Sequence, residues 1–264
     1  MAFHHRRDPP GHFGLNLGLG LRRRQAGSAE YVANPVRADG SNDWMRRNAD
    51  LTGSADSKLL TFSVWARYDA SQAMHIAFLG PNNAQEGFRI SSNLGEIIVA
   101  GRNSSNTEIV RFEINTTIND NNWHHIMGSF DLNSTLTRGF YVDNTDAETP
   151  GTWSPYTDAE MDLTRSNHFI LSRNAGTTKY SGDLADLQIW FGIYTDFSVQ
   201  ANRELFIKDG KPINPDTAAA TLGTPIIRLS GPTSGWETNK GSGGGFELVG
   251  ALSDPTPGTG PVEL

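Results

Sequence analysis

The alternation of side chains over residues 58–69 is the feature that most limits how this chain can fold. Every second residue is apolar, and these residues share one side of an extended chain because successive side chains of a strand point to opposite faces. The apolar side carries Leu60, Phe62, Val64, Ala66 and Tyr68. The opposite side carries Thr61, Ser63, Trp65 and Arg67. We therefore predict a half-buried strand whose apolar face requires a second layer.

Most of the remaining chain also favours short strands. We expect them near residues 75–79, 88–91, 96–100, 107–114, 123–131, 138–143, 168–172, 183–194 and 225–229. One helix is expected, with Ser198 as its N-cap, an apolar stripe that includes Phe206, and a stop at Gly210. Residues 144–166 are predicted to form an acidic loop, and the glycine-rich residues 241–245 a flexible connector. This succession predicts an all-β sandwich.

Composition and charge exclude several classes of protein. The chain has 264 residues and no cysteine, which excludes disulfide frameworks and zinc–thiolate sites and favours folding in a reducing cytoplasm. The first 28 residues carry five arginines and one aspartate, so their net charge is +4. Because the net charge of the whole chain is −7, the remaining residues carry a net charge of −11. An acidic body argues against a nucleic-acid surface, and no apolar run is long enough for a membrane helix.

Residues 1–28 form a basic arm that is predicted to dock on another surface. Its leucines alternate with glycine or asparagine, so they share one side of an extended chain and cannot bury one another. The predicted partner-binding residues are Leu15, Leu17, Leu19, Leu21, Arg22, Arg23 and Arg24. Two alternatives stay open, in which the arm packs on its own domain or its arginines bind nucleic acid. We divide the chain into this arm (1–28), a sandwich (29–231) and a Gly/Pro-rich C-terminal tail (232–264).

Four motifs occur in an order that resembles a known family. They are Ser63-Val64-Trp65 within residues 60–67, the Trp123-His124-His125-Ile126 run that continues to Asp131, Phe140-Tyr141-Val142-Asp143, and residues 182–190. This order resembles the laminin-G-like members of the concanavalin A-like lectin/glucanase superfamily. The resemblance implies a jelly-roll sandwich of two antiparallel sheets with one short helix. Loops at residues 38–43, 51–58 and 241–251 are similar to versions of this domain in bacteriophage structural proteins.

The family includes hydrolases, but catalytic and metal sites find little support in this sequence. Its hydrolases carry Glu-x-Asp-x-Glu on one strand, which this chain lacks, and Asp183 and Asp186 are expected to point to opposite faces. His124 and His125 are adjacent on a strand, so they diverge and are expected to be structural. Calcium suits the oxygen-rich residues 143–162 better than zinc does, yet no calcium-loop pattern is present. We expect no enzyme activity and no cofactor, with calcium as the alternative.

These observations favour a non-enzymatic structural or decoration protein of a virion, made in the host cytoplasm and anchored by the arm. We expect it to be a homo-oligomer or part of a larger assembly. The alternative is a carbohydrate-binding adhesion module for host surface glycans. Its predicted binding residues are Trp153 and Tyr156, two loop aromatics that form a platform in this hypothesis. In the competing interpretation both rings only cover the edge of the sandwich.

Overall fold

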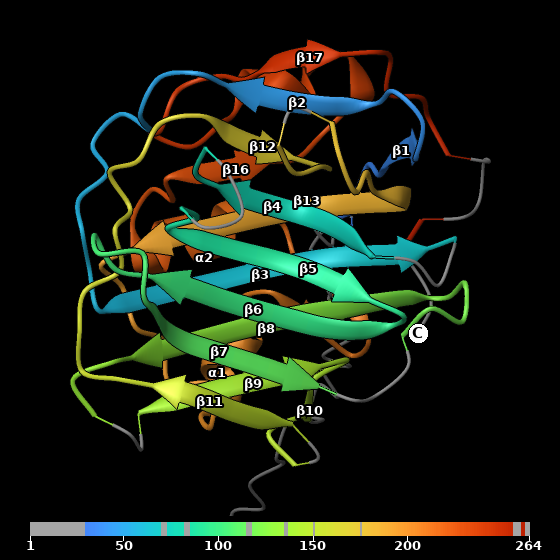
Figure 1. The fold of residues 1–264 in the computed structure, drawn as a ribbon. Helices are drawn as coiled ribbons and strands as arrows, with labels where there is room; N and C mark the ends of the chain where they lie inside the picture. Colours follow the sequence, from blue (N-terminus) through green and yellow to red (C-terminus); the bar gives the residue numbers. More distant parts are fainter. Residues whose placement is uncertain are drawn as a thin grey trace, which may run out of the picture. The chain divides into compact units, whose positions relative to one another are not determined.

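A computed structural model describes residues 30–69, 73–81, 85–114, 118–134, 137–149, 151–174, 176–255 and 260–261. Two antiparallel sheets lie face to face (Figure 1). In order, the eight-stranded sheet holds β11 (Thr152–Tyr156), β7 (Glu108–Ile114), β6 (Glu96–Arg102), β5 (Phe88–Asn93), β4 (Met74–Leu79), β12 (His168–Ile170), β2 (Trp44–Arg47) and β17 (Glu247–Val249).

The seven-stranded sheet is the layer behind it in Figure 1. Its order is β1 (Val36–Asp39), β13 (Ser181–Phe191), β3 (Leu59–Tyr68), β8 (Trp123–Asp131), β9 (Arg138–Val142) and β10 (Thr145–Asp146), and β16 (Ile227–Leu229) also pairs with β13. The other described strands, β14 (Ile207–Lys208) and β15 (Lys211–Pro212), form a hairpin. The described helices are α1 (Gln200–Arg203), α2 (Pro215–Leu222) and the 3-10 helix η1 (Thr233–Thr238). None of the described helices is long and apolar enough to cross a membrane. The predicted all-β jelly-roll sandwich is confirmed.

Strand β3 lies at the centre of the seven-stranded sheet, between β13 and β8. The five apolar side chains predicted to face inward all belong to the core between the sheets. The prediction of a half-buried strand is wrong, however, because Thr61, Ser63 and Trp65 on the opposite face are also at most 2% exposed. The sequence around β3 does not show this second cover, since it comes from a distant segment.

Residues 193–222 cover the outer face of β3. Phe197, Phe206 and Ala218 from this segment form a second apolar cluster with Trp65 and Trp190 on the outer face of the sheet. The buried hydroxyl of Thr61 is satisfied there, because it donates to the Ile193 carbonyl at 2.9 Å. The outer face of β3 is therefore buried at Thr61, Ser63 and Trp65, while the side chain of Arg67 stays 14% exposed.

The helices in this cover differ from the predicted helix. Helix α1 has only four residues, its N-cap is Val199, and no side chain caps it, so the prediction of Ser198 as cap is wrong. Helix α2 was not predicted, although its start carries a clear signal: Asn214 accepts a hydrogen bond from the Asp216 N–H, and Pro215 occupies the first turn.

Two further corrections concern segments predicted to be irregular. Residues 144–166 contain β10 and β11 and are not simply a loop. Residues 241–245 are not a flexible connector, because the Gly243 N–H donates to the Ile226 carbonyl at 2.9 Å and its own carbonyl accepts from Thr52 at 3.0 Å. A Cβ at Gly243 would lie 2.6 Å from the Ile226 oxygen, so glycine permits this close approach.

The segment after residue 245 joins the two sheets. Strand β17 pairs with β2 at the edge of the eight-stranded sheet, and a few residues later Ser253 pairs with Arg37 of β1 at the edge of the other sheet. Residues 246–253 are thus an integral part of the sandwich.

Candidate functional site

The outer face of the eight-stranded sheet carries charged side chains at β5, β6 and β7. Register places Arg89, Ala100 and Arg111 side by side on these strands. Their neighbours Ile90, Val99 and Phe112 form the alternate row, which faces the core. None of the described helices or strands covers the outer face in the view of Figure 1.

Six side chains form what we call the charged row: Glu86, Arg89, Arg102, Glu108, Arg111 and Glu113. Glu86, on the loop before β5, pairs with Arg89 and lies 2.9 Å from the Arg102 guanidinium. A bulge after Gly101 brings Glu108 opposite Arg102, where both Arg102 and Arg89 approach it at 3.5 Å. The row continues through an Arg111–Glu113 pair at 3.0 Å.

Burial and charge vary along the charged row. Glu86 is fully buried, whereas the side chains of Arg111 and Glu113 are 26% and 31% exposed. Burial lowers the pKa of Arg89, and the carboxylates of Glu86 and Glu108 oppose this effect. Three arginines balance three glutamates, so the row offers fixed hydrogen-bond donors and acceptors with little net charge.

Trp153 and Tyr156, the predicted glycan-binding residues, lie on the edge strand β11. The Trp153 ring centroid is 4.6 Å from that of Phe112, and the Tyr156 hydroxyl donates to the Asp131 carbonyl at 2.9 Å. The Arg138 guanidinium lies 5.2 Å and 5.0 Å from the two ring centroids, and the rings are inclined at 88°. This geometry closes the edge of the sandwich and does not form a flat platform. Their role in glycan binding stays a prediction.

The two adjacent histidines diverge as predicted. His125 is fully buried, its Nε2 lies 2.8 Å from the Ser63 hydroxyl, and burial lowers its pKa to about 3. His124 lies between two carboxylates, with Nδ1 2.7 Å from Asp143 and Nε2 3.0 Å from Asp120. Burial opposes protonation of His124, but its hydrogen bonds to Asp143 and Asp120 outweigh burial and raise its pKa. Both histidines have protein partners that explain their positions.

The two aspartates of β13 do not point to opposite faces, and that expectation is wrong. A bulge after Ala185 gives Asp186 a φ of 49° and turns its side chain toward Tyr31, which packs on the outer cluster. The Tyr31 hydroxyl donates to the Asp186 oxygens at 2.9 Å and 3.1 Å. Asp183, also on the outer face, binds the Arg67 Nε at 2.6 Å and Arg37 at 3.1 Å. Neither carboxylate is available for hydrolysis.

Among the described residues, no group of three or more histidine, aspartate or glutamate side chains is placed to hold a metal ion. This includes the described part of residues 143–162, where calcium was considered. The seven predicted docking residues of the arm lie outside the described residues, and their role stays a prediction.

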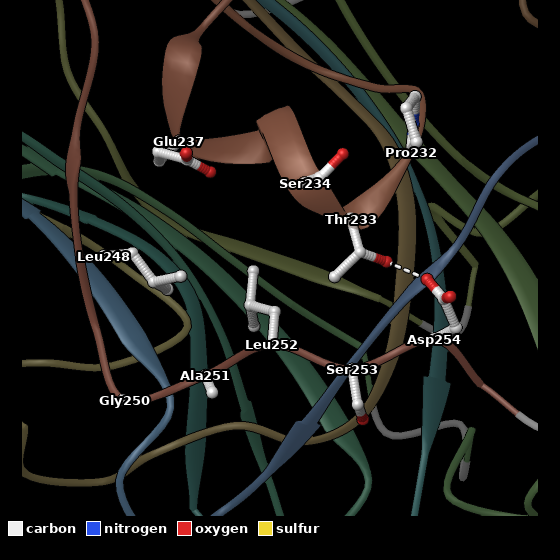
Figure 2. A pocket seen from close by; sticks show the side chains of 10 residues that line it. All are labelled: Pro232, Thr233, Ser234, Glu237, Leu248, Gly250, Ala251, Leu252, Ser253 and Asp254. Carbon is white, nitrogen blue, oxygen red and sulfur yellow. Dashed lines mark hydrogen bonds between the residues drawn. The ribbon is translucent and has the colours of Figure 1, made fainter.

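A pocket of about 530 Å³ lies between η1 and the segment that follows β17 (Figure 2). We call it the edge pocket. Its lining residues are Pro232, Thr233, Ser234, Glu237, Leu248, Gly250, Ala251, Leu252, Ser253 and Asp254. No sequence motif marks it, because its two halves lie apart in the sequence and meet through contacts such as the hydrogen bond from the Phe246 N–H to the Glu237 carbonyl.

Solved structures share this fold at low sequence identity. A "putative carbohydrate binding protein" from Bacteroides ovatus aligns over 87% of this chain and 62% of its own, with 12% identity and a TM-score of 0.57. The heptameric SAP-like pentraxin from Limulus polyphemus aligns over 65% of this chain and 82% of its own, with 12% identity and a TM-score of 0.46. The LG4-5 domains of the mouse laminin α1 chain align over 64% of this chain and 45% of their own, with 16% identity and a TM-score of 0.44.

This chain therefore spans less than two thirds of the Bacteroides and mouse chains. No curated protein matches it significantly. A family model described as "Concanavalin A-like lectin/glucanases superfamily" matches residues 39–200, which cover most strands of both sheets. The laminin-G-like resemblance of the sequence is thus confirmed, and the chain belongs to the concanavalin A-like lectin/glucanases superfamily.

Proposed function

We propose that this protein is a non-catalytic carbohydrate-binding module that binds a neutral glycan across the charged row. The observation that carries the proposal is a strip of arginines and glutamates, fixed by their own ion pairs, on a face that none of the described helices or strands covers.

Sugar hydroxyls both donate and accept hydrogen bonds, and the charged row offers partners of both kinds. Hydrogen bonds to charged groups are stronger than neutral ones, contributing about 1.5–3 kcal/mol. Because Arg111 and Glu113 hold each other in place, less side-chain entropy is lost when a ligand binds. The balanced charge favours a neutral saccharide over an anion or a cation.

The ion pairs also support a binding role over a catalytic one. Glycoside hydrolysis requires one carboxyl group that carries a proton beside a second that is ionised. Every carboxylate of the charged row pairs with an arginine. The naming of the Bacteroides neighbour as a carbohydrate-binding protein is consistent with this proposal, although a likeness at 12% identity supports the fold alone.

A glycan array followed by calorimetry tests the proposal. Arg111→Gln and Glu113→Gln each remove one charged partner at the exposed end of the row, and we expect each to weaken binding of the best neutral glycan by about 10-fold to 100-fold. Trp153→Ala should leave the affinity unchanged. If Trp153→Ala abolishes binding while the row variants bind normally, the aromatic pair is the site and the proposal for the row is wrong.

As a second function, we propose that the N-terminal arm attaches the protein to a virion. The support is the sequence of the arm alone, with its four alternating leucines and its arginines. Deleting residues 1–24 should leave a folded protein that no longer incorporates into particles. Normal incorporation of the truncated protein would refute this attachment, and light scattering of the isolated chain tests whether it forms an oligomer.

A further inference from the structure

The edge pocket differs from the charged row in its chemistry. Leu248 and Leu252 give it an apolar part, and Glu237 and Asp254 bring carboxylates from its two sides (Figure 2). The Thr233 hydroxyl donates a hydrogen bond to Asp254, which holds that carboxylate against η1.

Hydrogen bonds fix both walls of the pocket before any ligand arrives. On the η1 side, Trp236 is fully buried, its indole N–H donates to the Gly231 carbonyl at 3.0 Å, and the Glu237 carbonyl accepts from the Phe246 N–H at 2.7 Å. On the other side, the Ala251 N–H donates to Asp43 at 2.9 Å. A pocket held in this way loses little entropy on binding, which favours affinity.

The charge of the pocket selects the ligand. No arginine, lysine or histidine is among the described residues that line it. Within the described part of the chain, neither Glu237 nor Asp254 forms an ion pair. In an acidic protein such a pocket attracts a cation and repels an anionic sugar.

The remaining lining narrows the class of cation. Ser234 and Ser253 add hydroxyls beside the carboxylates, and these suit a ligand with several hydroxyl groups of its own. The leucines suit a ligand with a C–H face. A volume of about 530 Å³ falls within the roughly 300–1,000 Å³ of small-molecule sites. A protonated amino sugar combines the charge, the hydroxyls and the apolar ring face, whereas a lysine side chain offers no hydroxyls.

We propose that the edge pocket binds an oligosaccharide of amino sugars through its protonated amines, with Glu237 and Asp254, on opposite sides of the pocket, each the partner of one ammonium group. This second site is independent of the charged row and does not require the row to bind a glycan.

Calorimetric titration of the full-length protein with a glucosamine tetramer tests the proposal. We expect Glu237→Gln and Asp254→Asn each to weaken binding by about 10-fold to 100-fold, since each removes one charged acceptor and keeps the shape of the side chain. Glu160→Gln removes the same charge from an exposed position outside the pocket and should leave the affinity unchanged.

Two further ligands complete the experiment. The fully N-acetylated tetramer lacks the positive charge and should bind at least about tenfold more weakly. A short lysine-containing peptide should bind more weakly than the glucosamine tetramer because it cannot use the hydroxyls. Equal affinity for the two tetramers, wild-type affinity in both pocket variants, or tighter binding of the peptide would each overturn the proposal.

Discussion

The buried carboxylate of Asp186 should make the stability of this protein depend on pH in a way that one substitution removes. Asp186 is 3% exposed and has no ion pair among the described residues, and its direct partner is the Tyr31 hydroxyl. Burial raises its pKa to about 7, while the hydrogen bond from Tyr31 and the charge of Arg228 partly oppose this rise. The carboxyl group is therefore protonated in the folded protein at pH values where it is ionised in the unfolded chain.

The sign and size of the effect follow from that difference. A pKa that rises from 3.8 to about 7 on folding gives a stabilisation that is fully present below pH 3.8. It is lost as the pH rises to about 7, and the loss corresponds to roughly 4 kcal/mol at about 1.4 kcal/mol per unit. In Asp186→Asn the side chain stays neutral at every pH, and asparagine tolerates the φ of 49° at this position.

Urea denaturation of the wild type and of Asp186→Asn measures the effect. The titrations are repeated between pH 4.5 and 9 in steps of about one pH unit. The free energy of unfolding of the wild type, relative to that of Asp186→Asn, should fall by about 3 kcal/mol over this range, because part of the loss occurs below pH 4.5, and should level off above pH 7. Other titrating groups, such as His124, act equally in both proteins and cancel in the difference.

A second variant tests the assignment to Asp186. Tyr31→Phe removes the hydrogen bond that lowers the pKa of Asp186, so the fall in stability should move to higher pH. If the wild type and Asp186→Asn change in parallel with pH, the buried carboxyl group does not titrate as described and the reasoning is refuted.

Three further changes test other contacts. Asp183→Asn leaves the Arg37 and Arg67 guanidinium groups without their buried partner, and it should lower the free energy of unfolding in urea by about 3–5 kcal/mol. Asp69→Asn is the control: the side chain of Asp69 is 21% exposed, and its loss should lower the free energy of unfolding by less than about 1 kcal/mol. His124→Asn should lower the free energy of unfolding more at pH 5 than at pH 9, because His124, whose pKa is raised, stabilises the fold only while its ring is protonated. Equal losses at the two pH values would contradict this reasoning. Gly243→Ala should destabilise by about 1–3 kcal/mol through its clash with the Ile226 carbonyl, and Gly235→Ala, with open space around its Cβ, is the matched control in thermal melts.

The sequence predicted strands well where alternation and apolar content agree. Residues 123–131 were predicted as a strand and form β8 with those bounds. Strand β11 was missed because it is an edge strand that contains Pro155 and lies among acidic residues, and both features are typical of loops. Helix α2 could have been found, since Asn214 and Pro215 form a standard helix start.

Burial on the outer face of β3 could not be predicted from the strand itself. Trp65 is 1% exposed because Phe197 and Phe206, more than 130 residues away, complete its cluster. Alternation reports only which side chains share a face, and whether a second layer covers that face depends on where a distant segment packs.

The charged row shows the same limit for function. The alternation of β7 places Arg111 and Glu113 on one face, and that much was visible in the sequence. Glu86 precedes its strand, and Glu108 faces Arg102 only because a bulge adds one residue to β7. Without the bulge, Glu108 would point to the core side, and Arg102 and Arg89 would share only the carboxylate of Glu86. The balanced charge from which we infer a neutral ligand therefore depends on one backbone irregularity, which no local pattern of residues reveals.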